Sequence, residues 1–144
     1  MTVFGPYRAT VSSIHDGDTL DVDLVLAPTG KVRAGHEHDL GFNVWRTTRG
    51  TEIRSQSVRL LGCNAPELAT PAGKAALAFI ETLVKVGDVV QLVSHGWDKY
   101  GGRIDGTVTL ADGRDLTATM ISAGQAAPWD GKGAKPIPAA VTGA

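Results

Sequence analysis

Apolar and polar residues alternate along the first part of the chain with the two-residue period of β-strands. Residues 7–14 alternate loosely, and residues 20–26 place leucine and valine side chains at every second position. This period gives a strand one buried and one exposed face. Between the two segments, residues 16–18 read Asp-Gly-Asp, a composition that favours a tight turn. We therefore expect two strands joined by that turn.

A third strand is expected where an apolar run over residues 58–61 (Val-Arg-Leu-Leu) ends at Gly62. Residues 64–66 (Asn-Ala-Pro) follow, and they indicate a rigid turn, because asparagine tolerates unusual backbone angles and proline holds the preceding residue extended. The chain between the second and third strands, residues 27–57, is an extended and largely polar connection. The sequence does not define its conformation.

The second half of the chain carries the signals of two helices. A Thr-Pro pair at residues 70–71 provides an N-cap and a proline in the first turn, and apolar residues then recur at helical spacing up to a stop at Gly87. The second helix is expected from a cap at Asp115 to a stop at Gly124. Short apolar strands are expected over residues 89–93 and 104–110.

This order of elements fits a β-rich α+β fold, a five-stranded OB-fold barrel with two helices. We expect a single domain over residues 1–127, and the 144-residue chain is long enough to bury a core. Beyond it the composition shifts to glycine, proline, lysine and alanine. Residues 128–144 are therefore expected to form a Gly/Pro-rich C-terminal tail.

Charge and cysteine content narrow the possible functions. The formal net charge is −1, which argues against a protein that coats nucleic acid indiscriminately but permits an enzyme whose cations are confined to a cleft. Cys63 is the single cysteine, so the chain forms neither an internal disulfide nor a cysteine-based zinc site. We expect it to be a small buried thiol.

The first residues show neither the charged segment nor the apolar run of a signal peptide. No apolar run approaches the ~20 residues that cross a bilayer. We therefore expect a cytoplasmic protein that makes no membrane contact. The sequence does not determine the oligomeric state, for which a monomer is the favoured expectation.

Three polar segments occur in a specific order along this scaffold: DGDT at residues 16–19, VRLLGCNAPE at 58–67 and DKYGGR at 98–103. Each is ordinary by itself, but the ordered set resembles the staphylococcal nuclease (thermonuclease-like) family over residues 7–126. The resemblance implies an SNase-like OB-fold domain. It also implies a calcium-dependent nuclease that hydrolyses phosphodiester bonds of DNA with little sequence preference, RNA being left open.

The resemblance places three residues in catalytic roles. Arg59 and Arg103 match the two arginines that clamp the phosphate, a role that suits a planar guanidinium, which can donate to two phosphate oxygens at once. Glu67 matches the glutamate usually assigned as general base. Surface salt bridges remain the alternative for the arginines. A carboxylate favoured by the helix dipole remains the alternative for Glu67.

The resemblance also implies a calcium site. Asp18 matches the main metal carboxylate, Asn64 stands where the family prototype has a second aspartate, and Ala65 stands where a threonine lends its backbone carbonyl. Oxygen donors of this kind suit calcium, the expected cofactor, better than zinc or copper. The asparagine keeps an oxygen ligand but removes a charge, so the departure at Asn64 puts the metal affinity in doubt.

Lys99 and Tyr100 match positions that touch the terminal phosphate of the substrate, and Trp129 lies near the base-stacking tyrosines of the prototype. A tail residue packed onto the barrel is an equally good interpretation of Trp129. A second departure is the doubled glycine, Gly101-Gly102, which either displaces Arg103 or forms a bulge that leaves it in place.

Two hypotheses follow. In the first, the protein is a nuclease whose partner is its nucleic-acid substrate, and the retained arginines and glutamate favour it. In the second, the domain is a catalytically weak or inactive OB-fold module that holds nucleic acid or a protein partner, and only the changes at Asn64 and Gly102 support it. Cleavage that requires calcium would distinguish them.

Overall fold

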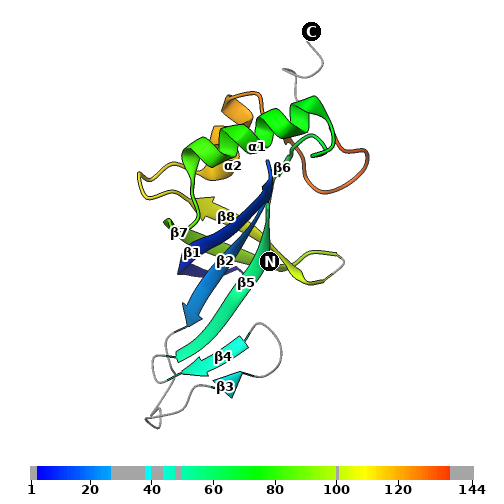
Figure 1. The fold of residues 1–144 in the computed structure, drawn as a ribbon. Coiled ribbons are helices and arrows are strands. Elements are labelled where there is room, and N and C mark those ends of the chain that lie inside the picture. The colour runs from blue at the N-terminus through cyan, green and yellow to red at the C-terminus, as the bar shows by residue number, and fades with distance from the viewer. Residues whose placement is uncertain (1–2, 27–37, 40–43, 48–49, 100, 137–144) are drawn as a thin grey trace.

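The computed structural model describes residues 3–26, 38–39, 44–47, 50–99 and 101–136, and its centre is a closed barrel. The barrel strands follow the order β2-β1-β7-β8-β5, and pairing between β2 and β5 closes the ring (Figure 1). Neighbouring strands are antiparallel except β5 and β8, which run parallel. The strands are β1 (Phe4–Asp16), β2 (Thr19–Leu26), β5 (Gly50–Leu60), β7 (Val89–Trp97) and β8 (Arg103–Thr109).

Alternation along these strands supplies the core of the barrel. Leu20 and Val22 of β2, Val58 and Leu60 of β5 and Leu92 of β7 are fully buried. Two helices cover one end of the barrel, α1 (Pro71–Leu83) and α2 (Leu116–Ser122) (Figure 1). They add further apolar side chains to the same core, namely Ala76, Ile80, Leu116 and Met120. The predicted five-stranded barrel with two helices is confirmed.

Both predicted helix starts are confirmed. Thr70 Oγ1 accepts a hydrogen bond from the backbone N–H of Gly73 at 3.0 Å, and Asp115 caps α2 in the same way. The predicted end of α1 at Gly87 is wrong, because the helix ends at Leu83 and Val84 is already extended. The Val84 side chain is buried, and the N–H of Gly87 donates to the carbonyl of Val11 in β1, so this stretch is bonded to the barrel instead of continuing the helix.

The third barrel strand begins earlier than its apolar run predicts. The pattern places its start at Val58, but β5 starts at Gly50, inside the predicted 27–57 connection. Backbone pairing with β2 and with β4 (Val44–Thr47) builds this extension, so it needs no apolar alternation. A bulge at Ser55, whose N–H donates to Asp23, interrupts the register with β2. β4 and β3 (His38–Asp39) lie at the end of the barrel opposite the helices (Figure 1).

Two glycines allow close contacts between the Asp-Gly-Asp turn, the turn after β5 and helix α1. A Cβ on Gly17 would lie 2.8 Å from the Cβ atoms of Ala65 and Ala76. A Cβ on Gly73 would lie 1.8 Å from the backbone carbonyl oxygen of Glu67. Such separations are too short for real atoms, so these segments meet only because both positions lack a side chain.

The segment after α2 returns to the barrel. A short strand, β9 (Ala127–Pro128), pairs with β6 (Cys63–Asn64), and the N–H of Trp129 donates to the carbonyl of Gly62 at 2.9 Å. Residues 137–144 of the predicted tail lie outside the described residues, and the domain boundary at 127 stays a prediction. None of the described helices is long and apolar enough to span a membrane.

Candidate functional site

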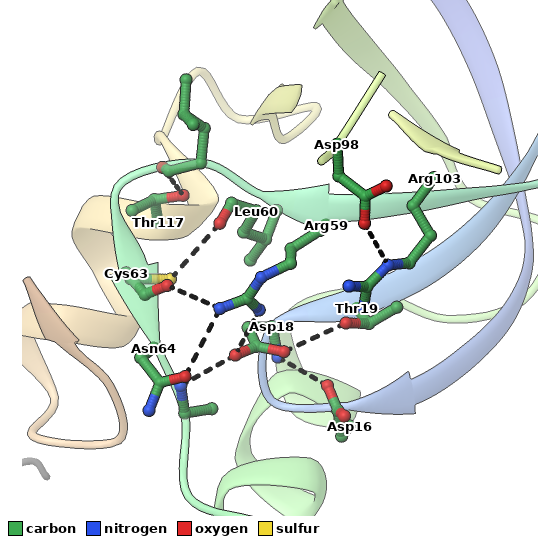
Figure 2. A network of polar contacts seen from close by, with 12 residues as sticks. Asp16, Asp18, Thr19, Arg59, Leu60, Cys63, Asn64, Asp98, Arg103 and Thr117 are labelled. Carbon is green, nitrogen blue, oxygen red and sulfur yellow. Dashed lines mark hydrogen bonds and ion pairs between the residues drawn. The ribbon is translucent and has the colours of Figure 1, made fainter. Parts of the chain in front are cut away.

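Asp18 and Arg59 form the centre of the site. The turn at Asp16 leads into β2, whose first residue, Thr19, pairs in register with Arg59 near the end of β5. Arg59 Nη1 lies 2.8 Å from Asp18 Oδ2, and the two side chains are 14% and 8% exposed. Figure 2 shows this pair at the middle of a connected network of polar groups. A buried carboxylate is thereby matched by a buried cation.

Hydrogen bonds fix the Asp18 carboxylate. Its Oδ2 also accepts from the backbone N–H of Ala65 at 2.9 Å, and its Oδ1 accepts from Thr19 Oγ1 at 3.0 Å. Burial by itself would raise the pKa of Asp18, but hydrogen bonds from Asp16, Ala65 and Arg59 hold it below its usual value. Burial, together with the hydrogen bond and charge of Asp18, raises the pKa of Asp16 to about 6. Of these two carboxylates, Asp18 therefore loses its proton at the lower pH.

Arg59 also contacts the turn after β5 and the segment after α2. Its Nη2 lies 3.4 Å from Asn64 Oδ1 and 3.5 Å from the carbonyl oxygen of Cys63. The guanidinium carbon lies 5.6 Å from the centre of the Trp129 ring, within the range of a cation–π interaction. Asn64 donates in turn from Nδ2 to the carbonyl of Pro136 at 3.2 Å. Strand β5, its following turn and the C-terminal segment together position this arginine.

Arg103 is held differently. Its Nε lies 2.7 Å from Asp98 Oδ2 (Figure 2), and the backbone N–H of Asp98 donates to the carbonyl of Arg103 at 2.8 Å. The doubled glycine before it adopts positive φ angles of 74° at Gly101 and 80° at Gly102, which glycine tolerates without strain. The carbonyl of Gly102 accepts from the Gln56 side chain. The extra residue is therefore absorbed in the loop between β7 and β8.

Arg59 and Arg103 line the same cavity, of about 230 Å³, which we call the first cavity. Two other predicted substrate-binding residues, Lys99 and Trp129, also line it. Tyr100, the remaining one, lies outside the described residues. The first cavity thus gathers the cations and the aromatic ring that the sequence analysis singles out.

Glu67, Asn64 and Ala65 line a different cavity, of about 650 Å³, which we call the second cavity. The Glu67 side chain is exposed, whereas its backbone carbonyl is fixed by Thr70, which donates from its N–H at 3.0 Å and from its Oγ1 at 2.7 Å. The structure therefore divides the predicted site between two cavities. The contact between Arg59 and Asn64 connects their walls.

The surroundings of Cys63 do not favour a role as a nucleophile. Its side chain is 1% exposed, as the sequence predicts. Burial, with the nearby charge of Asp18, raises the pKa of the Cys63 thiol to about 12. A buried thiol that keeps its proton is a poor nucleophile.

The sequence analysis assigned no role to several residues of the site, among them Asp16, Asp98 and Lys132. The Asp-Gly-Asp doublet contains the signal for Asp16, since its two carboxylates flank one glycine. Asp98 lies in the DKYGGR segment, but its pairing with Arg103 follows from the hairpin and not from a local pattern. Lys132 lines the first cavity from the segment after α2, and no sequence feature indicates this placement.

The donors near Asp18 fit a hard cation in type. Carboxylate oxygens of Asp16 and Asp18 and the amide oxygen of Asn64 belong to one network (Figure 2), and oxygen donors are those that calcium prefers. Among the described residues, no group of three or more His, Cys, Asp or Glu side chains is arranged to hold a metal ion. A metal site here would therefore depend on amide and backbone oxygens as well as carboxylates.

A family model described as staphylococcal nuclease homologue matches residues 57–135. The chain belongs to this family. As a staphylococcal nuclease homologue, it carries a nuclease-type or nucleic-acid-binding module. The matched residues include both arginines and Glu67, whereas Asp18 lies before them. No curated protein matches the chain.

Proposed function

We propose that the protein is a calcium-dependent nuclease that hydrolyses phosphodiester bonds of nucleic acid with little sequence preference. The observation that carries this proposal is the meeting of Arg59 and Arg103 in the first cavity, each held by a carboxylate. Attack on a phosphodiester adds negative charge to the phosphate oxygens, and preorganised cations stabilise that charge. A site of two fixed guanidinium groups is well suited to this task.

Each arginine keeps donors for a phosphate. Arg103 gives its Nε to Asp98, and its two terminal nitrogens have no hydrogen-bond partner among the described residues. Arg59 gives Nη1 to Asp18, while its Nη2 contacts at 3.4 and 3.5 Å are long for hydrogen bonds. A phosphate can replace those long contacts without breaking the ion pair to Asp18.

Glu67 is assigned as the base that takes a proton from the attacking water. Its side chain is exposed in the second cavity, so water can reach it. Asp18, Asn64 and the backbone carbonyl of Ala65 would hold the calcium ion. When bound, calcium supplies a divalent charge that neutralises phosphate oxygens. A positioned carboxylate base contributes ~10²–10⁴-fold in rate.

The ion pairs also support a second candidate, a binding module without catalysis. Asp18 is bound to Arg59, and the described residues include no metal-binding group of three acidic, cysteine or histidine side chains. A module of this kind would still attract phosphates through its arginines. It would hold nucleic acid without cutting it.

Cleavage assays separate the two candidates. Supercoiled plasmid and a labelled single-stranded oligonucleotide are incubated with the protein in calcium, magnesium, manganese or chelator. The nuclease proposal expects cleavage in calcium that the chelator abolishes. Binding of the oligonucleotide without cleavage under every metal condition would overturn it and leave the binding module.

A further inference from the structure

The residues that follow β9 form a fixed loop along the wall of the first cavity, and we call residues 129–133 the Trp129 loop. Trp129 Nε1 donates to the carbonyl of Lys132 at 2.9 Å, which closes the loop, and the N–H of Lys132 donates to Asp130 Oδ1 at 2.9 Å. The N–H of Trp129 joins the loop to Gly62. In Figure 1 this stretch is the orange-red segment after α2. The loop is thus bonded internally and to the barrel.

Lys132 differs from the arginines that share its cavity. Arg59 and Arg103 are each paired with a buried carboxylate. The Lys132 ammonium makes neither a hydrogen bond nor an ion pair with any described residue, although Asp105 and Asp130 line the same cavity. Its backbone is fixed while its charge is unpaired within this part of the structure. Such a cation is available to an anion from solution.

We propose that Lys132 binds a second phosphate of a single-stranded nucleic acid, next to the phosphodiester held by Arg59 and Arg103. The inference rests on the proposed function for the identity of the first phosphate. A lysine is a mobile point charge on a flexible stem, which suits a flanking phosphate that needs no fixed orientation. The guanidinium groups suit the reacting phosphate, which must be aligned. One cavity wall thereby serves two neighbouring phosphates.

Carboxylates near Lys132 oppose the binding of an anion, so their partners matter for this proposal. Asp98 is engaged by Arg103, and Asp130 accepts from the backbone N–H of Lys132, so both are directed to partners inside the protein. Asp105 faces the same space as these residues. The residues that line the cavity supply four cations, Arg59, Lys99, Arg103 and Lys132, and three carboxylates, Asp98, Asp105 and Asp130, while Arg59 is also paired with Asp18. Removing Lys132 would therefore leave carboxylates in excess around the cavity.

Binding measurements test the inference without requiring cleavage. The dissociation constant of a labelled single-stranded oligonucleotide is measured against salt concentration for the Glu67→Gln protein with native Lys132, with Lys132→Ala and with Lys85→Ala. Lys85, beyond the C-terminal end of α1, lines neither cavity and is the matched control for charge. Loss of one phosphate contact should lower the slope of log affinity against log salt by ~0.7 for single strands. We expect this change, with weaker binding, only for Lys132→Ala.

A substrate with a single phosphate provides a second test of the inference. Lys132→Ala should raise the KM for the oligonucleotide severalfold and affect hydrolysis of bis(p-nitrophenyl) phosphate much less, because this compound has no flanking phosphate and feels only the change in the overall charge of the cavity. Lys132→Arg should restore the salt slope. The inference is overturned if Lys132→Ala binds the oligonucleotide as Lys85→Ala does, or if it impairs both substrates equally. Failure of the nuclease proposal would be seen separately, as oligonucleotide binding by the native protein with no cleavage in calcium.

Discussion

The first and second cavities share one polar network but differ in the groups that line them. The first combines four cationic side chains with three carboxylates and the Trp129 ring, whereas the second is lined mainly by small and apolar residues, with the amide of Asn64, the exposed carboxylate of Glu67 and one lysine, Lys135. Arg59 belongs to one and touches the other through Asn64. On the proposed function, the arginines of the first cavity bind the phosphate of the substrate. Asn64 and Glu67 in the second cavity bind the metal ion and activate water. Substitutions in the two walls should therefore change different measured quantities.

The largest effect is expected in the second cavity. Glu67→Gln should lower the cleavage rate by about two decades or more, because a base is removed, while oligonucleotide binding stays near normal. The side chain is exposed, so the free energy of unfolding should change little. Glu81→Gln, on the exposed face of α1, is the control. Near-normal turnover of Glu67→Gln would refute the assignment of the base.

Arg59→Lys should be nearly as damaging, since an ammonium cannot present two parallel donors to a phosphate. The lysine keeps the charge opposite Asp18, so the protein should remain folded, which circular dichroism would check. Arg114→Lys removes an exposed guanidinium paired with Asp112 and serves as the control. If Arg59→Lys cleaves at the native rate, the arginine has a structural role only, and the first cavity loses its assigned function.

Asn64→Asp tests the metal side of the comparison. A carboxylate in place of the amide adds attraction to a divalent ion, partly offset by repulsion from Asp18 and by desolvation, for a net gain of roughly 1–2 kcal/mol. The calcium concentration at half-maximal cleavage should fall about tenfold.

The same substitution removes the amide that donates to Pro136, so the free energy of unfolding should fall by about 1 kcal/mol. Calcium titrations and urea unfolding of both proteins separate the two effects. An unchanged or raised calcium midpoint would show that Asn64 is not a ligand.

Substitutions of Trp129 test whether its ring stacks on a base of the substrate or positions Arg59. A cation–π contact at this distance is worth about 1 kcal/mol, so Trp129→Ala should lower kcat/KM about fivefold. Trp129→Phe should retain most of the activity because it keeps a ring. Hydrolysis of bis(p-nitrophenyl) phosphate, which has no nucleobase, should fall in parallel if the ring acts on Arg59. A loss confined to oligonucleotides would mean that Trp129 stacks on a base.

The smallest effect is expected from deletion of Gly102. Both glycines are exposed and adopt positive φ angles, and a single glycine can form a tight turn here at the cost of the hydrogen bond from the Gln56 side chain to the Gly102 carbonyl. Cleavage should change by about threefold or less. A large gain in rate would show that Arg103 is displaced in the native chain, contrary to its position beside Arg59 in the first cavity.

The local parts of the site could be predicted from the sequence. Alternating leucines and valines give the barrel strands, and the Asp-Gly-Asp turn brings Asp18 to the start of β2. Each of these elements has its own signal in the chain. The ion pair between Asp18 and Arg59 was not predicted, because it depends on the pairing of β2 with β5, which no local pattern specifies.

The contacts between distant segments could not be predicted. Pairing of β6 with β9 involves two residues from each strand and no apolar repeat, yet it sets Trp129 over Arg59. The pattern of apolar residues does not reveal the early start of β5, because the first half of this strand is polar and is held by backbone pairing. Likewise, the ion pair between Asp98 and Arg103 depends on the register of β7 and β8.

The close contacts at Gly17 and Gly73 leave no room for a side chain at either position, and the arrangement of the whole site depends on them. One methyl group at Gly17 would push against Ala65 and Ala76, and one at Gly73 would push against the carbonyl of Glu67. Either would shift the turn that carries the proposed ligands and base without altering any group that meets substrate. The proposed activity would therefore be sensitive to substitution at two positions that have no side chain at all.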